Sequence, residues 1–230
     1  MNVGMMRVKN EARWIKRCVE SILPICERVL IMDDHSTDGT ADICASIPGV
    51  KLLASPFDGL NETRDKNWLL SQVGPADWIV AIDGDELLAD PELLLKAMEQ
   101  PVKCLRLPIL YLWNSEDQVR VDGVYRMYKS EGRASVFRPN GAVFQSTQHG
   151  GNFHCGNVPA ALRPDASYCR ARLLHFGYMH REDRERKFSW YNQQDPGNNL
   201  EDHYRHMVVG DIFPAESRFE HGGPLRLEPV

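Results

Sequence analysis

The chain has 230 residues, of which 43 % are hydrophobic and 26 % charged, and its formal net charge is −5 at pH 7. This composition is typical of a soluble globular protein with one domain, or one domain and a subdomain. The negative charge gives no overall attraction to nucleic acid or to an anionic membrane. No apolar run approaches the roughly 20 residues that cross a bilayer. The start of the chain lacks the pattern of a secretory signal. We therefore expect a cytoplasmic protein without an integral membrane segment.

Strand and helix patterns alternate four times in the first 100 residues. Apolar runs predict strands at residues 3–8, 28–32, 50–54 and 78–82, and a helical pattern follows each of them. Asn10, Asn61 and Asp90 stand where N-cap residues of three of these helices are expected. Such alternation is typical of βαβ units, so we expect an α/β protein with a mostly parallel central sheet.

The pattern changes after residue 100. Shorter strands are predicted at residues 103–113, 119–128, 134–137 and 142–144, without a good helix between them. Antiparallel additions to the sheet fit these segments better than further crossovers. A last strand at residues 168–176 and C-terminal helices at 181–191 and 201–207 follow, and the tail from Pro214 reads as irregular.

Three predicted strands in the first half end in strongly polar residues: Lys9-Asn10-Glu11, Asp33-Asp34 and Asp83-Gly84-Asp85. The carboxyl ends of parallel strands open on one edge of a sheet, where α/β proteins bind their ligands. Two carboxylates around a glycine suit a hard divalent cation that also binds a diphosphate. An ordinary acidic turn is the alternative interpretation of Asp83 to Asp85.

The segments Arg7-Val8-Lys9-Asn10-Glu11, Asp33-Asp34-His35-Ser36-Thr37-Asp38-Gly39-Thr40 and Asp83-Gly84-Asp85 resemble, in this order, the motifs of a family 2 glycosyltransferase. The resemblance covers about the first 100 residues. It implies a Rossmann-like GT-A fold. Residues 1–100 would bind a nucleotide-diphosphate sugar donor and residues 101–213 an acceptor, with 214–230 as the irregular tail.

The resemblance also implies roles for individual residues. Val8 and Glu11 would line the nucleotide pocket, and Asp34, with Asp33 beside it, would recognise the base. Arg64, next to Asp65, would lie near the base or the diphosphate. Asp83 and Asp85 would bind the ribose and a Mg²⁺ or Mn²⁺ ion that bridges the two donor phosphates. His175 is the candidate for a late metal ligand of such folds, and a hydrogen-bonded core histidine is the alternative.

Three basic residues in the second half have a spacing of three along a predicted helix: Arg181, Arg184 and Lys187. They can share one face that binds phosphates. Because acidic residues are interleaved with them, a solvated salt-bridge helix is an equal alternative.

The general base is the least determined part of the site. Some family members place a glutamate directly after a histidine, beyond a strand like Val136-Phe137-Arg138. Here the corresponding stretch reads Gln148-His149-Gly150-Gly151, so the glutamate is missing. Asp122, Glu131 and His149 are the candidates, with Asp122 slightly preferred. A retaining mechanism, which needs no such base, stays open.

Other interpretations concern cysteine, histidine and aromatic residues. The six cysteines have no CxxC spacing, so we expect reduced and mostly buried thiols. A zinc cluster is a weaker alternative, because the spacing fits no closed site; its members would be His149, His154, Cys155, Cys169 and His175. Tyr111 and Trp113 are candidates for stacking on an acceptor sugar, with a core position as the more frequent alternative.

The sequence therefore predicts a metal-dependent glycosyltransferase, with a UDP-sugar as the expected donor from the frequency of such donors in the family. A nucleotidyltransferase on a related fold is one alternative, although residues 1–13 contain a single glycine where that class carries a glycine-rich loop. A non-catalytic nucleotide-sugar-binding module is another. The acceptor cannot be read from the sequence, and a homodimer stays open.

Overall fold

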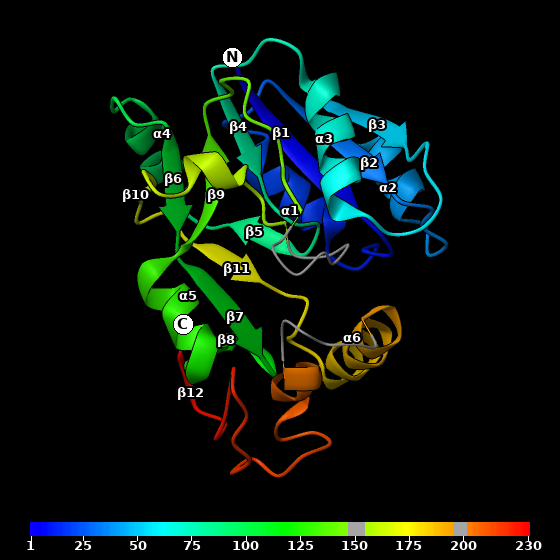
Figure 1. The fold of residues 1–230 in the computed structure, drawn as a ribbon, viewed down its shortest axis with the longest axis vertical. Helices are drawn as coiled ribbons and strands as arrows, with labels where there is room; N and C mark the ends of the chain where they lie inside the picture. The colour runs from blue at the N-terminus through cyan, green and yellow to red at the C-terminus, as the bar shows by residue number, and fades with distance from the viewer. Residues whose placement is uncertain (147–154, 196–201) are drawn as a thin grey trace. The chain divides into compact units, whose positions relative to one another are not determined.

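A computed structural model describes residues 1–146, 155–195 and 202–230. The chain forms two compact units, which are interleaved along the sequence (Figure 1). The first unit consists of Met1–Leu107 and Arg133–Ala171, and the second of Pro108–Gly132 and Arg172–Val230. The donor half, acceptor half and tail expected from the sequence are a division of roles and stay predictions.

The first unit is a seven-stranded sheet with helices, in the strand order β10-β6-β9-β4-β1-β2-β3. Its elements are β1 Asn2–Val8, α1 Ile15–Ile22, β2 Arg28–Asp33, α2 Thr40–Ser46, β3 Val50–Ala54, α3 Glu62–Val73, β4 Trp78–Ala81, β5 Glu86–Leu88, α4 Pro91–Met98, β6 Cys104–Leu107, β9 Arg133–Phe137, the 3-10 helix η1 Ala160–Leu162 and β10 Ser167–Tyr168. Strands β4, β1, β2 and β3 are parallel, and β9 runs antiparallel between β4 and β6. The four predicted strand–helix alternations and the mostly parallel sheet are confirmed.

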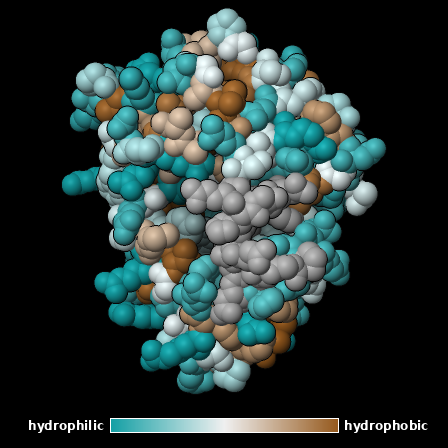
Figure 2. Space-filling view, viewed as in Figure 1, coloured by the Kyte–Doolittle hydropathy of each residue, from teal (hydrophilic) through white to brown (hydrophobic). Residues whose placement is uncertain are grey.

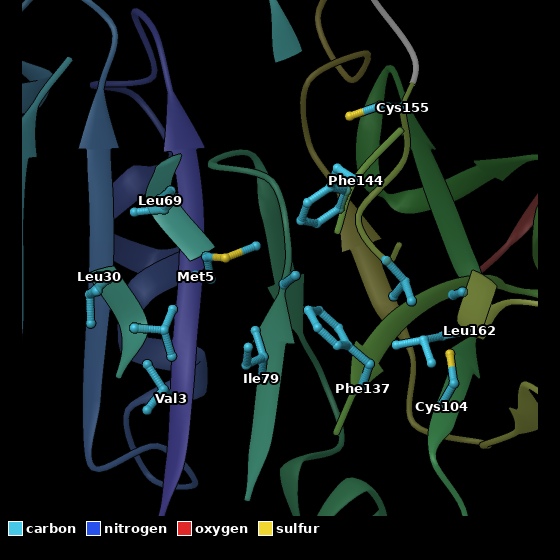
Figure 3. Packing of buried hydrophobic residues seen from close by; sticks show 14 of the residues in the cluster. Val3, Met5, Leu30, Leu69, Ile79, Cys104, Phe137, Phe144, Cys155 and Leu162 are labelled. Carbon is cyan, nitrogen blue, oxygen red and sulfur yellow. The ribbon is translucent and has the colours of Figure 1, made fainter. Parts of the chain in front are cut away.

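Helices cover both faces of this sheet. Successive residues of β1 point to opposite faces and therefore contact different helices. Val3 and Met5 belong to a buried cluster with Leu69 of α3 (Figure 3). Gly4 has the opposite direction, since a Cβ built on it would lie 2.7 Å from Ile22 of α1. The cluster on the α3 side continues through Ile79, Phe137, Phe144, Cys155 and Leu162. Residues 155–162 therefore pack into the core of the first unit.

The second unit contains a smaller sheet with strands in the order β12, β8, β7 and β11. Its elements are β7 Ile109–Trp113, β8 Ser115–Arg120, α5 Gly123–Glu131, β11 Leu173–His175, α6 Arg181–Gln194, the 3-10 helix η2 Asp202–Val208 and β12 Leu227–Pro229. The strands β12, β8 and β7 are antiparallel neighbours, and β11 is parallel to β7.

Several predictions for residues after 100 were wrong. The predicted strand at 103–113 is divided at Pro108, which has no N–H for a ladder. The predicted strand at 119–128 ends at Arg120, and α5 follows because Tyr125 is buried on one helical face. Residues 142–144 form no strand. In place of one strand at 168–176, β10 ends at Tyr168 and β11 begins at Leu173, and the two pair with different neighbours.

Other corrections concern the ends of the chain's elements. Asn10 does not cap α1, whose N-cap residue is Trp14; Asn10 has a φ of 55°, and its Oδ1 accepts from the amide of Thr37 at 2.8 Å. The predicted helix at 201–207 is the 3-10 helix η2, and the tail supplies β12 to the second sheet. Asn61 caps α3 as predicted, accepting from the amide of Arg64.

Polar residues dominate the face of the molecule seen in Figure 2. Exposed large apolar side chains occur on several different elements, among them Leu93, Met127, Tyr168 and Ile212. Scattered residues of this kind are ordinary on protein surfaces. Across the described part of the chain, the helices are too short or too polar to pass through a bilayer.

Candidate functional site

The polar strand ends predicted from the sequence lie at one edge of the first unit's sheet. Val8, the last residue of β1, is paired with Asp33, the last residue of β2. Strand β4 lies parallel to β1 on its other side, and Asp83 follows two residues after β4 ends. Asp33, Asp34 and Asp83 therefore lie at the carboxyl ends of β2 and β4, the two parallel strands on either side of β1, as expected.

The turn after β2 is bonded to the loop after β1. The amide of Asn10 donates to Oγ of Ser36 at 2.9 Å, and the amide of Glu11 donates to Oγ1 of Thr40 at 2.8 Å. Asp33 accepts from the amide of Ser36 at 3.0 Å, which closes the turn. These bonds hold both loops at the edge of the sheet.

Asp38 supports the same pair of loops. Its carboxylate accepts from the amides of Ala12 and Thr40, each at 3.0 Å. Burial by itself raises the pKa of Asp38, but the hydrogen bonds from Thr40 and Ala12 outweigh burial and lower it. Asp38 and Thr40 therefore have a structural role in this turn.

A cluster of charged residues surrounds Asp34. Nη2 of Arg7 lies 2.7 Å from Oδ2 of Asp34, and Nζ of Lys9 lies 3.3 Å from the same oxygen. Nε of Arg7 donates to Oδ2 of Asp65 at 2.9 Å, and Arg64 donates to Oδ1 of Asp65 at 2.9 Å. Both aspartates are buried, so the basic residues compensate carboxylates that have lost most of their hydration.

Arg64 thus pairs with Asp65. Its guanidinium also donates to the carbonyl oxygens of Asp58 and Gly59, at 3.3 and 2.7 Å, and lies over the ring of Phe57. About a third of the Arg64 side chain is exposed. Its predicted contact with the base or the diphosphate stays a prediction.

The acidic turn after β4 is organised by Arg133, at the start of β9. Nη1 of Arg133 lies 3.2 Å from Oδ2 of Asp83, and Nη2 lies 2.6 Å from Oε2 of Glu86. The same oxygen of Glu86 accepts from the amide of Asp83 at 3.0 Å. The side chain of Glu86 is fully buried, and burial raises its pKa to about 7 in spite of the charge of Arg133.

The other oxygen of Asp83 has a separate partner. Nδ2 of Asn157 donates to Oδ1 of Asp83 at 3.1 Å, and Oδ1 of Asn157 accepts from Nζ of Lys66 at 3.0 Å. Burial raises the pKa of Asp83, but the charges of Arg133 and Lys66 outweigh it and lower the pKa overall. Asp83 is therefore held as a carboxylate in a fixed orientation.

Gly84 leaves room for the loop after β1. A Cβ built on Gly84 would lie 2.9 Å from Cγ1 of Val8 and 3.2 Å from Cγ of Glu11. Val8 and Glu11, which are predicted to line a nucleotide pocket, can therefore lie close to the acidic turn because Gly84 has no side chain. Asp85, the next residue, is buried with 3 % of its surface exposed.

Sequence reasoning missed Arg133, Asn157 and Lys66, and gave Glu86 no role. The position of Arg133 is explained by a strand register that was not assigned from the sequence. Strands β4 and β9 pair Ile79 with Phe137 and Val80 with Val136, and the same register continued along the chain sets Arg133 opposite Asp83. A loop and a helix bring Asn157 and Lys66 to Asp83.

The three candidates for the general base differ in burial and in hydrogen bonding. Asp122, in the second unit, accepts from Nε and Nη2 of Arg120 at 2.8 and 2.9 Å and from the amides of Gly223 and Arg226. Burial raises the pKa of Asp122, but these bonds and the charge of Arg120 lower it overall. Its use as a base is a prediction that these contacts do not favour. Glu131 is exposed at the end of α5, and His149 lies outside the described residues.

His175 lies in an aromatic cluster of the second unit. Its ring stacks on Tyr111 with the centroids 4.6 Å apart and is tilted against Tyr178 at 4.8 Å. Tyr111 and Trp113 are buried, so the core alternative predicted for both agrees with their positions. The role of His175 as a metal ligand stays a prediction.

The basic residues of α6 do not form one exposed face. Arg184 is buried and pairs with Asp211, with Nη2 and Oδ1 2.8 Å apart. Arg181 is exposed and pairs with Glu185 at 2.7 Å, while Nζ of Lys187 lies 5.4 Å from the centre of the Tyr178 ring. These contacts favour the salt-bridge alternative for Arg181 and a structural role for Arg184. Phosphate binding by the three residues stays a prediction.

All six cysteines are buried free thiols, as predicted. Burial raises the pKa of each of them, to about 12 for Cys26 and about 11 for Cys44 and Cys104. Between residues 1–146, 155–195 and 202–230, no group of three or more His, Cys, Asp and Glu side chains is arranged to hold a metal. The zinc alternative gains no support within these ranges.

Comparison with protein families decides what kind of chain this is. The model described as glycosyl transferase family 2 matches residues 5–144, which is more than half of the chain and includes all three strand-end motifs. The chain belongs to glycosyl transferase family 2. The family predicted from the motifs is confirmed.

Curated relatives agree with this family. An uncharacterized glycosyltransferase of Rickettsia bellii is 30 % identical over 141 residues, which are 57 % of this chain and 40 % of the relative. An uncharacterized protein of Mycobacterium tuberculosis is 23 % identical over 98 % of this chain and 63 % of the relative. The chain thus spans less than two thirds of the length of these relatives.

A solved structure supports the fold. TarS of S. aureus matches 92 % of this family 2 chain and 42 % of its own chain, with a TM-score of 0.54 and 12 % sequence identity. At this identity the likeness concerns the fold alone. The predicted GT-A fold, a mixed α/β architecture with a mostly parallel sheet, is confirmed.

The family makes a divalent ion a candidate cofactor, and the residues at the acidic turn fit one. Asp83 and Asp85 supply carboxylate oxygens, the ligands that Mg²⁺ and Mn²⁺ prefer. Mg²⁺ usually takes one or two carboxylates together with substrate phosphates rather than a complete protein site. The two carboxylates of this turn match such a partial site, which substrate phosphates would complete.

Proposed function

We propose that this chain transfers a sugar from a nucleotide-diphosphate sugar, specifically a UDP-sugar, to an acceptor, with a divalent cation at the acidic turn. The observation that carries the proposal is that Asp34 follows β2 while Asp83 and Asp85 follow β4, the two parallel strands that flank β1 in a family 2 sheet. Family membership favours a transferase over the nucleotidyltransferase and the non-catalytic binding module.

The charges around Asp34 support a base with an N–H on its pairing edge. Arg7 and Lys9 both donate to Oδ2 of Asp34, and a carboxylate only accepts hydrogen bonds. Uracil presents a donor N–H between two carbonyl oxygens, which matches this acceptor beside the amino group of Lys9. Cytosine and adenine present an acceptor nitrogen at the equivalent position and would repel the carboxylate.

The acidic turn supports the diphosphate end of the same donor. Asp85 and Asp83 would hold the ion, which when bound neutralises charge on the nucleoside diphosphate that leaves. Asp83, which is oriented by Arg133 and Asn157, would accept from a ribose hydroxyl. Val8 and Glu11, beside Gly84, would line the nucleotide between these two ends.

The acceptor side is proposed in less detail. An inverting transfer needs a base that removes the acceptor proton. Glu131 and His149 are the remaining candidates, because the carboxylate of Asp122 accepts four hydrogen bonds already. His175 is proposed as a further ligand of the ion.

A panel of nucleotide sugars and nucleoside diphosphates tests the function. Each compound is scored for thermal stabilisation and for slow hydrolysis of the donor, with Mg²⁺, with Mn²⁺ and with EDTA. We expect UDP and at least one UDP-sugar to stabilise the protein in the presence of metal, and slow release of UDP from that sugar. Stabilisation without any hydrolysis would favour the binding module, and no stabilisation by any compound would contradict the proposal.

A further inference from the structure

Arg133 closes a ring of contacts around the acidic turn. Its two terminal nitrogens contact Asp83 and Glu86 at 3.2 and 2.6 Å, and Glu86 accepts from the amide of Asp83 at 3.0 Å. Each member of the ring therefore restrains the other two. The Arg133 side chain is 21 % exposed and Glu86 is fully buried, so these two members of the ring lie mostly away from water.

Asp83 receives its orientation from three separate parts of the chain. Arg133, on β9, holds Oδ2, and Asn157, in the loop before η1, holds Oδ1. Lys66 of α3 fixes Asn157 in turn, through Oδ1 and through the carbonyl oxygen of Gly156, both at 3.0 Å. Yet 41 % of the Asp83 side chain is exposed, so this carboxylate is fixed in direction and still open to a ligand.

This combination differs from a purely structural ion pair. If Arg133 served only to compensate the buried Glu86, one contact would be enough. Its second contact goes to Asp83, whose side chain is 41 % exposed and therefore depends less on a compensating cation than the fully buried Glu86. Fixing a binding group before the ligand arrives lowers the entropy cost of binding.

We propose that Arg133 is a positioning residue for the donor: through its paired contacts with Asp83 and Glu86, it sets the direction in which Asp83 meets the ribose–diphosphate part of the nucleotide. This rests on the proposed function. The residue itself acts through Asp83 and touches no reacting atom.

The test measures the affinity for UDP with Mg²⁺ by calorimetry, and the melting temperature, in the same set of variants. Arg133→Gln removes the guanidinium, Arg133→Lys keeps the charge without the paired geometry, and Arg133→Gln with Glu86→Gln also removes the buried acid. Arg138→Gln is the matched control: Arg138 follows the same strand, and its guanidinium donates to carbonyl oxygens of Val102 and Met98.

We expect Arg133→Gln to bind UDP about tenfold more weakly than the wild type and to melt at a lower temperature. Adding Glu86→Gln restores the melting temperature, since no buried acid is left without its cation, but does not restore affinity. Arg133→Lys recovers the affinity only in part, and Arg138→Gln binds like the wild type.

Three outcomes overturn the inference. Wild-type affinity in Arg133→Gln, or affinity that returns together with the melting temperature in the double variant, would leave Arg133 with a structural role alone. If Arg133→Gln does not fold, the double variant decides by the same criterion. A wild-type protein that binds no nucleoside diphosphate would remove the proposed function and this inference together.

Discussion

The guanidinium of Arg7 lies 2.7 Å from the carboxylate of Asp34, although Arg7 belongs to β1 and Asp34 follows the end of β2. The parallel register of β1 and β2 makes this contact possible. Val8, which follows Arg7, is paired with Asp33, which precedes Asp34. The same arginine holds Asp65 of α3. Arg7 thus connects the predicted base-recognition residue to the helix that covers the sheet.

Replacing Asp34 by asparagine should weaken binding of UDP at least about tenfold. The amide keeps the size of the side chain but loses the charge that Arg7 and Lys9 contact, and it can turn a donor toward the base. Calorimetric titration with UDP and Mg²⁺ measures the effect. Asp42→Asn, at an exposed position of α2, is the control. Equal affinities of Asp34→Asn and wild type would exclude Asp34 from base recognition.

Replacing Arg7 by methionine should lower the free energy of unfolding by about 3 kcal/mol. The change removes one cation from each of two buried carboxylates, Asp34 and Asp65. Urea denaturation measures it, with Lys16→Gln as the control, because Lys16 and Glu20 form an exposed pair worth little. A loss no larger than that of Lys16→Gln would show that the cluster does not stabilise the fold.

Replacing Gly84 by alanine should reduce nucleotide affinity more than it reduces stability. The new methyl group would stand 2.9 Å from Val8, whose branched side chain is buried and stiff, so the acidic turn or the loop after β1 has to shift. We expect a stability cost of about 1–2 kcal/mol together with a larger loss of UDP affinity. Parallel denaturation and titration measure both, and an unchanged affinity would separate Gly84 from the nucleotide site.

Replacing Asp122 by asparagine should lower stability by about 3 kcal/mol at neutral pH, because the buried Arg120 loses its partner. The pKa of Asp122 is lowered in the folded protein, so its stabilisation is complete above the ordinary pKa of 3.8 and is lost as the pH falls through the folded pKa. The gap in melting temperature between wild type and variant should therefore be constant near neutral pH and narrow in strong acid.

The same variant separates the two roles of Asp122. Donor turnover per folded molecule should persist in Asp122→Asn, since the carboxylate is engaged by Arg120 and by two amides. Complete loss of turnover in a variant that remains folded would instead support Asp122 as the general base.

The fold of the first half could be predicted because each strand there is a continuous apolar run and each helix has its own periodicity. Val8, Asp33 and Asp83 could then be assigned to one edge from the parallel sheet alone. The family motifs needed no long-range information, since every motif lies within a single strand and the loop that follows it.

The second half resisted the same reasoning for physical reasons. Tyr125 and Tyr128 have the spacing of one helix face, but aromatic residues also favour strands, and packing in the folded protein decided for α5. Arg133, Asn157 and Lys66 reach Asp83 from distant segments, so local patterns contain almost no signal for them. The departure at Asn10 has a similar cause: bonds to the turn after β2 replace its expected capping bond.

The most direct test of the account is the affinity for UDP of the wild type and of Asp85→Ala, each measured with Mg²⁺ or Mn²⁺ and with EDTA. We predict that metal strengthens binding of UDP to the wild type at least about tenfold, that Asp85→Ala binds UDP as weakly with metal as the wild type does with EDTA, and that the melting temperature without nucleotide shows both proteins folded. Equal affinity of the folded wild type with metal and with EDTA would contradict the metal site at Asp83-Gly84-Asp85.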